Sequence, residues 1–225
     1  MKIHYYGHSS FGLEINGNNI LFDPFISPNE KASKIQVKEI PADFILVSHG
    51  HQDHVADVEE IAKNTGAKIV SNFEIVSWFE EKGLEGHPMN HGGHWSFDFG
   101  RVQYVNAVHS SVLPDGTYGG NPGGFVVETS QGNFYYAGDT ALCMDMELIG
   151  RYKQLDFAFL PIGDNFTMGI EDGVRAAKMV GVKKVIAMHY DTFGYIEINH
   201  EEARKAFEEA GIELIMMEIG KSMNI

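Results

Sequence analysis

Residues 48–54 read SHGHQDH and place three histidines and one aspartate, all able to bind a metal, within six positions. The segment follows the apolar run 44–47, which has the length and branching of a buried strand, and precedes a helical pattern. Histidines two apart in an extended segment project to the same side, because strand side chains alternate with period two. The chain then turns, so Asp53 and His54 can face the same cavity from another direction. One loop can therefore supply two ligands to each of two metal ions.

The chemistry of these side chains limits which metal ions the site can bind. Imidazole and carboxylate ligands suit Zn²⁺, Mn²⁺ or Fe²⁺, and the absence of thiolate ligands argues against a purely structural zinc site. The segment also resembles the His-x-His-x-Asp-His signature of the metallo-β-lactamase superfamily, and this resemblance implies further ligands at later strand ends. Three are present in order, because the predicted strands 105–108, 134–137 and 185–188 lead into His109, Asp139 and His189. A strand-end histidine alone is more often structural, but the ordered set supports a metal centre.

The pattern along the chain predicts two sheets packed together with helices outside, an α/β (α+β) protein. Strands are predicted over 3–6, 11–15, 19–22, 44–47, 67–71, 95–99, 101–108, 125–129, 133–137, 157–160, 184–188 and 213–217, and helices over 55–66, 75–81, 170–180 and 199–210. Meanders followed by alternating strands and helices occur twice, and no linker interrupts them, so we predict one domain over 1–225. An Asp ends both β runs 19–23 and 133–139, and a His ends both 44–49 and 185–189, which suggests a duplicated half-domain.

The His-x-His-x-Asp-His signature resembles that of the metallo-β-lactamase superfamily of metal-dependent hydrolases. The resemblance implies a four-layered αββα sandwich with two metal ions at one edge of the sheets. It also implies ligand roles. One ion is held by His49, His51 and His109. The second is held by Asp53, His54 and His189, and Asp139 bridges the two ions.

The whole chain also resembles a smaller, largely uncharacterised family of metal-dependent hydrolases related to ascorbate-6-phosphate lactonases. The residues that carry this likeness are Gly7-His8-Ser9, the loop PIGDNFTMG at 161–169 and the motif HYDTF at 189–193. The motif continues with Gly194 where a proline is expected, and the loop after His109 is short. Both departures affect the expected pocket and leave the ligands intact.

Two divalent ions about 3.5–4 Å apart lower the pKa of a shared water toward ~7 and polarise a substrate oxygen. We therefore expect a metal-bridging hydroxide to attack a small phosphodiester, lactone or other ester. Asp53 is expected to be catalytic as well as a ligand, because it can orient that hydroxide. Zn²⁺ is the first expectation for both ions, with Mn²⁺ or Fe²⁺ as alternatives. Cys143 has no obvious base nearby and is expected to pack rather than react.

Four further residues are weaker candidates. His8 is assigned to catalysis at the site rim, against a capping or core role. Asp23 ends a strand and is expected to hydrogen-bond the free nitrogen of a ligating histidine. Asn165 is expected to donate to a substrate oxygen, or else to cap the next helix. Tyr190 is expected to contact a bound oxyanion, with packing as the alternative.

Charge and composition limit the partners. The 17 basic and 31 acidic side chains give a net charge of −14, which disfavours non-specific binding to nucleic acid or to an anionic membrane. No apolar run reaches the roughly 18 residues of a membrane span. A single cysteine excludes a disulfide framework, and two histidines interrupt the first ten residues where a secretion signal needs an apolar stretch. We expect a soluble cytoplasmic protein that acts on a small molecule; its oligomeric state stays open.

Two other functions compete with a small-molecule hydrolase. A nuclease or RNA-processing enzyme of the same superfamily would need basic residues at the site, and the four arginines do not cluster in sequence. Tight, salt-sensitive binding of a labelled single strand would favour it. A non-enzymatic metal-binding protein is disfavoured because all seven ligand positions are intact.

Overall fold

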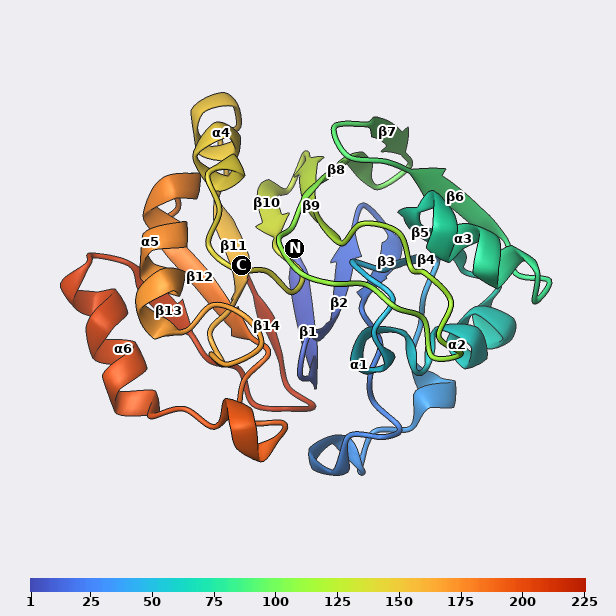
Figure 1. Cartoon of the computed structure of the whole chain (residues 1–225), viewed down its shortest axis with the longest axis horizontal. Coiled ribbons are helices and arrows are strands. Elements are labelled where there is room, and N and C mark those ends of the chain that lie inside the picture. Colours follow the sequence, from blue (N-terminus) through green and yellow to red (C-terminus); the bar gives the residue numbers. More distant parts are fainter.

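The computed structural model describes all 225 residues, and its two β-sheets pack face to face with helices outside each (Figure 1). The first sheet has the strand order β14-β1-β2-β3-β4-β5-β6. Its strands are β1 (Lys2–Gly7), β2 (Ser10–Ile15), β3 (Asn18–Phe22), β4 (Phe44–Leu46), β5 (Lys68–Asn72), β6 (Gly86–Met89) and β14 (Ser222–Asn224). β1 to β3 form an antiparallel meander, and β4 to β6 continue from β3 in parallel.

The second sheet has the order β13-β12-β11-β10-β9-β8-β7. Its strands are β7 (His94–Phe97), β8 (Gly100–Asn106), β9 (Gly123–Thr129), β10 (Gly132–Tyr136), β11 (Phe157–Pro161), β12 (Lys184–Met188) and β13 (Glu213–Ile215). All five residues of β11 are buried, as expected of a parallel strand covered on both faces.

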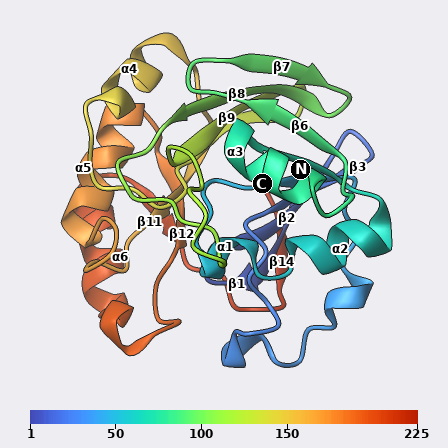
Figure 2. The same ribbon diagram turned by 45° about the vertical axis from the view of Figure 1, so that its right-hand side comes forward.

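Helices cover the outer faces of both sheets, which gives the four layers of an αββα sandwich (Figures 1 and 2). The α-helices are α1 (Gln52–Val55), α2 (Val58–Thr65), α3 (Phe73–Glu80), α4 (Asp145–Tyr152), α5 (Ile170–Val180) and α6 (His200–Glu209), and short 3₁₀ helices are η1 (Glu30–Ala32), η2 (Val37–Glu39) and η3 (Gly194–Ile196). α2 and α3 lie over the first sheet, and α4 to α6 over the second. No helix combines the length and apolarity needed to cross a bilayer.

Aromatic side chains join the two sheets. Phe11 of β2 lies 4.8 Å from Phe159 of β11, measured between ring centroids, and Phe22 of β3 stacks on Tyr136 of β10 at 4.5 Å. These contacts belong to a cluster of 41 buried residues that continues beneath α5 and α6. A second cluster of 16 lies between the first sheet and α2 and α3. The strand ends that hold the site are therefore fixed by a continuous core.

Several predicted elements differ from the structure. The helix expected over 55–66 is observed as α2, which begins three residues later, and a separate short helix, α1, ends at Val55. Between them the Asp57 side chain accepts from the backbone amides of Ile26 and Ser27. The strands β6 and β14, the helices α1 and α4, and the three 3₁₀ helices were not predicted. β6 contains His87 and Pro88, which have low strand propensity, and its pairing with β5 is a tertiary contact.

Of the two pairs of strand ends that suggested a duplicated half-domain, one occupies corresponding places in the two sheets and the other does not. Both sheets combine an antiparallel meander with a parallel run, so β3 corresponds to β10 and β4 to β11. Asp23 and Asp139 therefore follow corresponding strands. His49 and His189 do not, because His49 follows β4 whereas His189 follows β12, the counterpart of β5.

Candidate metal centre

Side chains of the site follow six strands, three in each sheet, and within a sheet the three strands run in the same direction. β1 and β3 are both antiparallel to β2, and β4 is parallel to β3. β8 and β10 are both antiparallel to β9, and β12 is parallel to β10 through β11. The side chains that follow these strands meet at one edge of the sandwich; they are His8, Asp23, His49, His109, Asp139 and His189.

Three of the predicted ligands form one group. His49, His51 and His109 place nitrogen atoms within 4.8 Å of one another, which is close enough for a single ion to contact all three. His49 is buried, and its Nε2 lies 3.0 Å from Nδ1 of His51. The hydroxyl of Ser111 links this loop to the 107–122 segment, because it accepts from the Gly50 amide.

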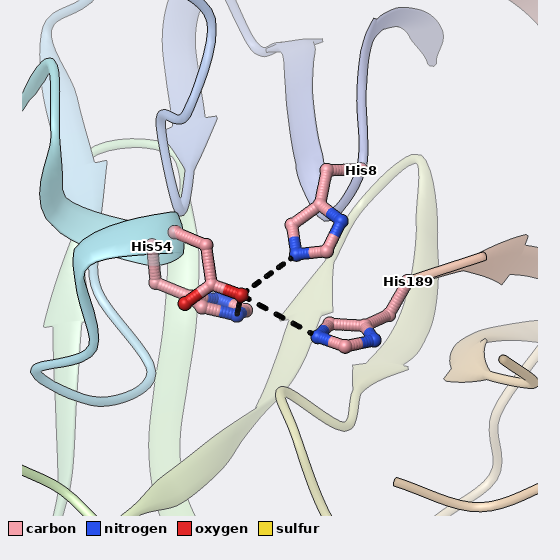
Figure 3. Close-up of side chains that lie close together, drawn as sticks. His8, His54 and His189 are labelled. Atoms are coloured by element: carbon pink, nitrogen blue, oxygen red, sulfur yellow. Dashed lines mark hydrogen bonds and ion pairs between the residues drawn. The ribbon is translucent and has the colours of Figure 1, made fainter. Parts of the chain in front are cut away.

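A second group contains Asp53, His54 and His189, together with His8 (Figure 3). The three histidines come from different elements, the end of β1, α1 and the end of β12, and their rings point toward one another. The Asp53 Oδ2 atom lies 3.7 Å from Nε2 of His189 and 3.9 Å from Nε2 of His54.

Asp139 lies between the two groups. Its Oδ2 is 2.8 Å from Nε2 of His189 and 3.3 Å from Nε2 of His54, on one side. On the other side it is 3.7 Å from Nε2 of His109 and 4.0 Å from Nε2 of His49. A carboxylate in this place can contact ions held by either group, as its predicted bridging role requires.

The residues present fit divalent metal ions. His54 Nε2 and Asp139 Oδ1 are buried and have no hydrogen-bond partner, and the 3.3 Å approach of His54 to Asp139 lacks hydrogen-bond alignment. Buried polar atoms without a partner cost free energy, and a bound cation would satisfy them. Five imidazoles and two carboxylates are donors that Zn²⁺, Mn²⁺ and Fe²⁺ all accept.

Asp23 makes the hydrogen bond expected of it. Its buried carboxylate is 2.8 Å from Nδ1 of His54, so the other ring nitrogen, Nε2, faces the cluster. The same carboxylate accepts from the Ser48 amide at 2.7 Å, the Ser48 hydroxyl at 2.6 Å and the Tyr136 hydroxyl at 2.8 Å. Sequence reasoning missed Ser48 and Tyr136, although they lie one and three residues before predicted ligands.

The structure places His8 inside the second group, and its catalytic role stays a prediction. Its side chain is fully buried beneath the partly exposed Asp53. The ionised Asp53 carboxylate can only accept, so we assign the ring proton of His8 to Nε2, which donates to Asp53 Oδ2 at 3.1 Å. Nδ1 of the neutral ring then accepts from the Thr192 hydroxyl at 2.8 Å, in preference to the longer 3.4 Å contact of that hydroxyl with the Tyr190 carbonyl. His8 therefore contacts Asp53 from behind and can position it, and Thr192 is a neighbour that sequence reasoning missed.

Charge pairing organises the ionisable side chains of the site. Burial lowers the pKa of His189, but the attraction of Asp139 outweighs burial and raises it to about 9. Burial raises the pKa of Asp139, but His189 and His54 outweigh it and hold that pKa well below the usual range. Burial lowers the pKa of His8 to about 4, helped by the charges of His189 and His54 and opposed by Asp53. Burial raises the pKa of Asp53, but the neighbouring histidines, His54 first, outweigh it and hold that pKa well below the usual range. Asp53 and Asp139 are thus both ionised and can bind cations.

The backbone at the site is strained. His8, Asp23 and His189 have φ values of 56°, 40° and 54°, in the left-handed region that residues other than glycine rarely adopt. Such conformations cost on the order of 1–3 kcal/mol each and collect at functional sites. Gly138 also has a positive φ of 62°, and it turns the chain from β10 so that Asp139 enters the cluster.

The two predicted substrate-binding residues have different surroundings. Tyr190 is buried in the main core cluster, with its ring 5.8 Å from that of His200, which agrees with the packing alternative; its oxyanion contact stays a prediction. Asn165 is exposed and lines a hollow of about 640 Å³ with Asp164 and Glu197, and none of the seven predicted ligands lines that hollow. Cys143 is partly buried and unpaired, as expected of a packing residue.

A two-sheet sandwich whose strand ends gather five histidines and two aspartates has the metallo-β-lactamase fold. Residues 18–190 match the family model described as a beta-lactamase superfamily domain, and the chain belongs to the metallo-β-lactamase superfamily.

Curated relatives match over the whole chain. A "UPF0173 metal-dependent hydrolase" of Christiangramia forsetii is 56% identical, with 100% of both chains covered. One of Methylacidiphilum infernorum is 53% identical, with 99% of both covered. Among solved structures, Igni18, described as a novel metallo hydrolase from Ignicoccus hospitalis, is 34% identical with a TM-score of 0.90, covering 99% of this chain and 97% of its own. The finer likeness to ascorbate-6-phosphate lactonases stays a prediction.

Proposed function

We propose that this protein is a hydrolase that uses two divalent metal ions to cleave a small phosphodiester, lactone or other ester. The observation that carries the proposal is the convergence of all seven predicted ligands, in two groups with Asp139 between them. The names of the relatives, metal-dependent hydrolases at more than 50% identity, support it.

The donor atoms indicate which residues would hold the ions. His49, His51 and His109 would hold one ion, a group of Asp53, His54 and His189 the other, and Asp139 both. When bound, such ions polarise a substrate oxygen and make water a stronger nucleophile at neutral pH. We expect Zn²⁺ first, with Mn²⁺ or Fe²⁺ as alternatives, because the same nitrogen and oxygen ligands serve all three.

The two carboxylates have different access to the substrate. The Asp53 side chain is 25% exposed, whereas that of Asp139 is only 2% exposed. Asp53 is therefore the carboxylate that can orient an attacking water and accept its proton. The hydrogen bond from His8 fixes Oδ2 of Asp53 for this task, and Asp23 fixes the ring of His54. We place the protein in a reducing cytoplasm, since its one cysteine is unpaired.

The test combines metal content with activity. Protein purified without added metal should contain about two transition-metal ions per chain by plasma mass spectrometry. It should hydrolyse at least one p-nitrophenyl phosphodiester, phosphomonoester or ester probe, or a lactone. His51→Ala and Asp139→Ala should abolish turnover with the fold retained, and His94→Ala, an exposed histidine of β7, should match the wild type. Zero metal and no activity after reconstitution with Zn²⁺ or Mn²⁺ would contradict the proposal and favour a binding protein.

A further inference from the structure

Exposed apolar side chains collect on three segments around the site, which we call the rim: 107–122, 161–169 and 190–199. These segments make up less than a fifth of the chain, yet they carry six of its eleven exposed large hydrophobic residues. The six are Val108, Val112, Tyr118, Phe166, Phe193 and Tyr195. Isolated surface hydrophobics need no explanation, but a concentration beside a reactive centre indicates a binding surface.

Hydrogen bonds hold the rim against the predicted ligands. Thr140, which follows Asp139, accepts from the Val108 amide through its hydroxyl at 3.0 Å. Its carbonyl accepts from the Met168 amide, also at 3.0 Å. The segments 107–122 and 161–169 are therefore both anchored next to the carboxylate between the two ligand groups.

The third segment begins directly after His189. The ring of Phe193 lies 5.3 Å from that of His8 and 6.1 Å from that of Phe25, measured between centroids. Tyr195 packs edge-on against Phe166 at 6.2 Å and so joins the 190–199 and 161–169 segments. In Figure 1 the 107–122 segment crosses in front of the strand ends, with the other two segments to its left and below.

The charged side chains within the rim segments are acidic. None of the 17 lysines and arginines lies in the three segments, whereas Asp115, Asp164, Asp191 and Glu197 do. The ammonium group of Lys31, a residue of η1, donates a hydrogen bond to the Asp191 carbonyl, so this neighbouring cation is already engaged. An anionic group held outside the metal centre would therefore meet carboxylates of like charge.

Within the proposed hydrolase function, we infer that the substrate is a neutral carboxylic ester or lactone whose non-reacting part is a hydrocarbon or aromatic group held by the rim. Water adds its oxygen to the acyl carbon, and the bond from that carbon to the ester oxygen breaks. A proton from water passes to the departing alkoxide, so the products are a carboxylic acid and an alcohol. Phosphate esters with anionic groups beyond the scissile bond are disfavoured.

A matched series of probes tests this inference on the metal-loaded protein. The kcat/KM for p-nitrophenyl esters should rise from acetate through butyrate to hexanoate, by about 2- to 3-fold per methylene, as partial burial of each group predicts. Mono-p-nitrophenyl adipate has the hexanoate chain with a carboxylate in place of its terminal methyl group. It should react at least about 10-fold more slowly than hexanoate, because the rim cannot pair that charge.

Rim variants locate the effect. Phe193→Ala and Tyr195→Ala should each reduce the hexanoate-to-acetate ratio of kcat/KM about 5-fold, whereas Tyr152→Ala, an equally exposed tyrosine on α4, should leave it unchanged. Turnover of acetate without a chain-length or charge preference would overturn this inference and leave the hydrolase function standing. Turnover of a phosphodiester probe with none of these esters would also overturn this inference alone. Failure of the metal-loaded protein on these esters and on the phosphate and lactone probes would overturn both.

Discussion

Gly138 has little room for a side chain at the metal centre. It combines a φ of 62° with close neighbours, because a Cβ there would lie 2.7 Å from the Ser48 Cβ and 2.8 Å from the Gly123 carbonyl oxygen. In Gly138→Ala the left-handed backbone conformation should therefore cost about 1–2 kcal/mol of folding free energy, and the new Cβ must also displace neighbouring backbone atoms. We expect a loss of about 3 kcal/mol or more in the free energy of unfolding, measured by urea denaturation.

A second glycine separates these two effects. Gly66 ends α2 with a similar φ of 76°, but a Cβ there would meet nothing within 4 Å. Gly66→Ala should therefore cost only about 1 kcal/mol, the left-handed penalty alone. Gly138→Ala should also lower the metal content, whereas Gly66→Ala should not. Equal losses of stability in the two variants would show that crowding at Asp139 is unimportant.

Thr192 should tune the metal centre through two intermediate residues. Thr192→Val keeps the shape of the side chain and removes the donor that fixes the ring of His8, and His8 in turn holds Asp53. Loss of such an outer contact typically weakens metal binding 10- to 100-fold. We expect about a 10-fold weaker second metal ion by titration against a competing chelator. Thr192→Ser retains the hydroxyl and should restore the affinity; the same loss in both variants would disprove the relay.

Asn72 links a helix to the segment that carries His109. As the N-cap of α3 it accepts from the Ile75 amide at 2.9 Å, and its buried amide group donates to the carbonyls of Gly119 and Asn121 at 2.8 and 3.2 Å. Asn72→Asp keeps the cap but turns two donated hydrogen bonds into repulsion between oxygens. We expect a loss of about 2–4 kcal/mol in unfolding free energy and faster proteolysis within 107–122.

Another N-cap provides the control. Asn199 caps α6 by accepting from the amides of Glu201 and Glu202, and it is exposed and donates no hydrogen bond of its own. Asn199→Asp preserves both accepted bonds and should change stability by less than about 0.5 kcal/mol. A loss there comparable to that of Asn72→Asp would mean that the cap, not the link to the loop, carries the effect.

Elements with strong local patterns were predictable from the sequence. The buried residues of α5 recur as Gly173, Ala176, Ala177 and Val180, a helical repeat, and Gly181 ends the helix with φ of 77° as its position suggests. The turn at Asn16 and Gly17, with φ of 51° and 81°, is equally local. β14 could not be foreseen, because three residues carry little pattern and only β1, far away in the chain, makes them a strand.

The site residues also divide into those that a local pattern predicts and those that depend on distant contacts. The seven ligand positions followed from one dense motif and from strand ends in a fixed order. The direction of a side chain after a strand was not predictable, since the left-handed backbone at His189 sends this ring into the cluster and leaves Tyr190 in the core. His8 and Thr192 meet across 184 positions, so no local signal joins them.

Stability of the metal-free protein should fall between about pH 7.5 and 9. The pKa of His189 is raised to about 9 in the folded state, against about 6.5 in an unfolded chain. Its stabilisation is fully present below pH 6.5 and is lost as the pH rises through 9, at a total cost of about 3 kcal/mol, and the raised pKa of His54 acts in the same direction. The histidines with lowered pKa values oppose this fall only up to about pH 7.5, where an unfolded chain has lost nearly all of their protons; they are His8, His49, His51 and His109.

The measurement is the urea midpoint of chelator-treated protein at pH 7.5, 8.0 and 8.5. It should decrease, whereas the midpoint of the metal-loaded protein should decrease less, because metal binding requires deprotonated ligands and so strengthens with pH. The gap between the two forms should therefore widen. A constant or rising midpoint for the metal-free form would refute the charged pairing of His189 with Asp139.

The pairing of β14 with β1 also bears on how the chain is made. On the ribosome, β1 emerges long before β14, the strand that covers its outer side, because the residues from 8 to 221 are made between them. Throughout synthesis β1 is therefore an open edge that can pair with a neighbouring nascent chain. Lys2 and His4 on β1 are both hydrogen-bonded to Glu14 of β2, and they give this strand polar groups until β14 has been made.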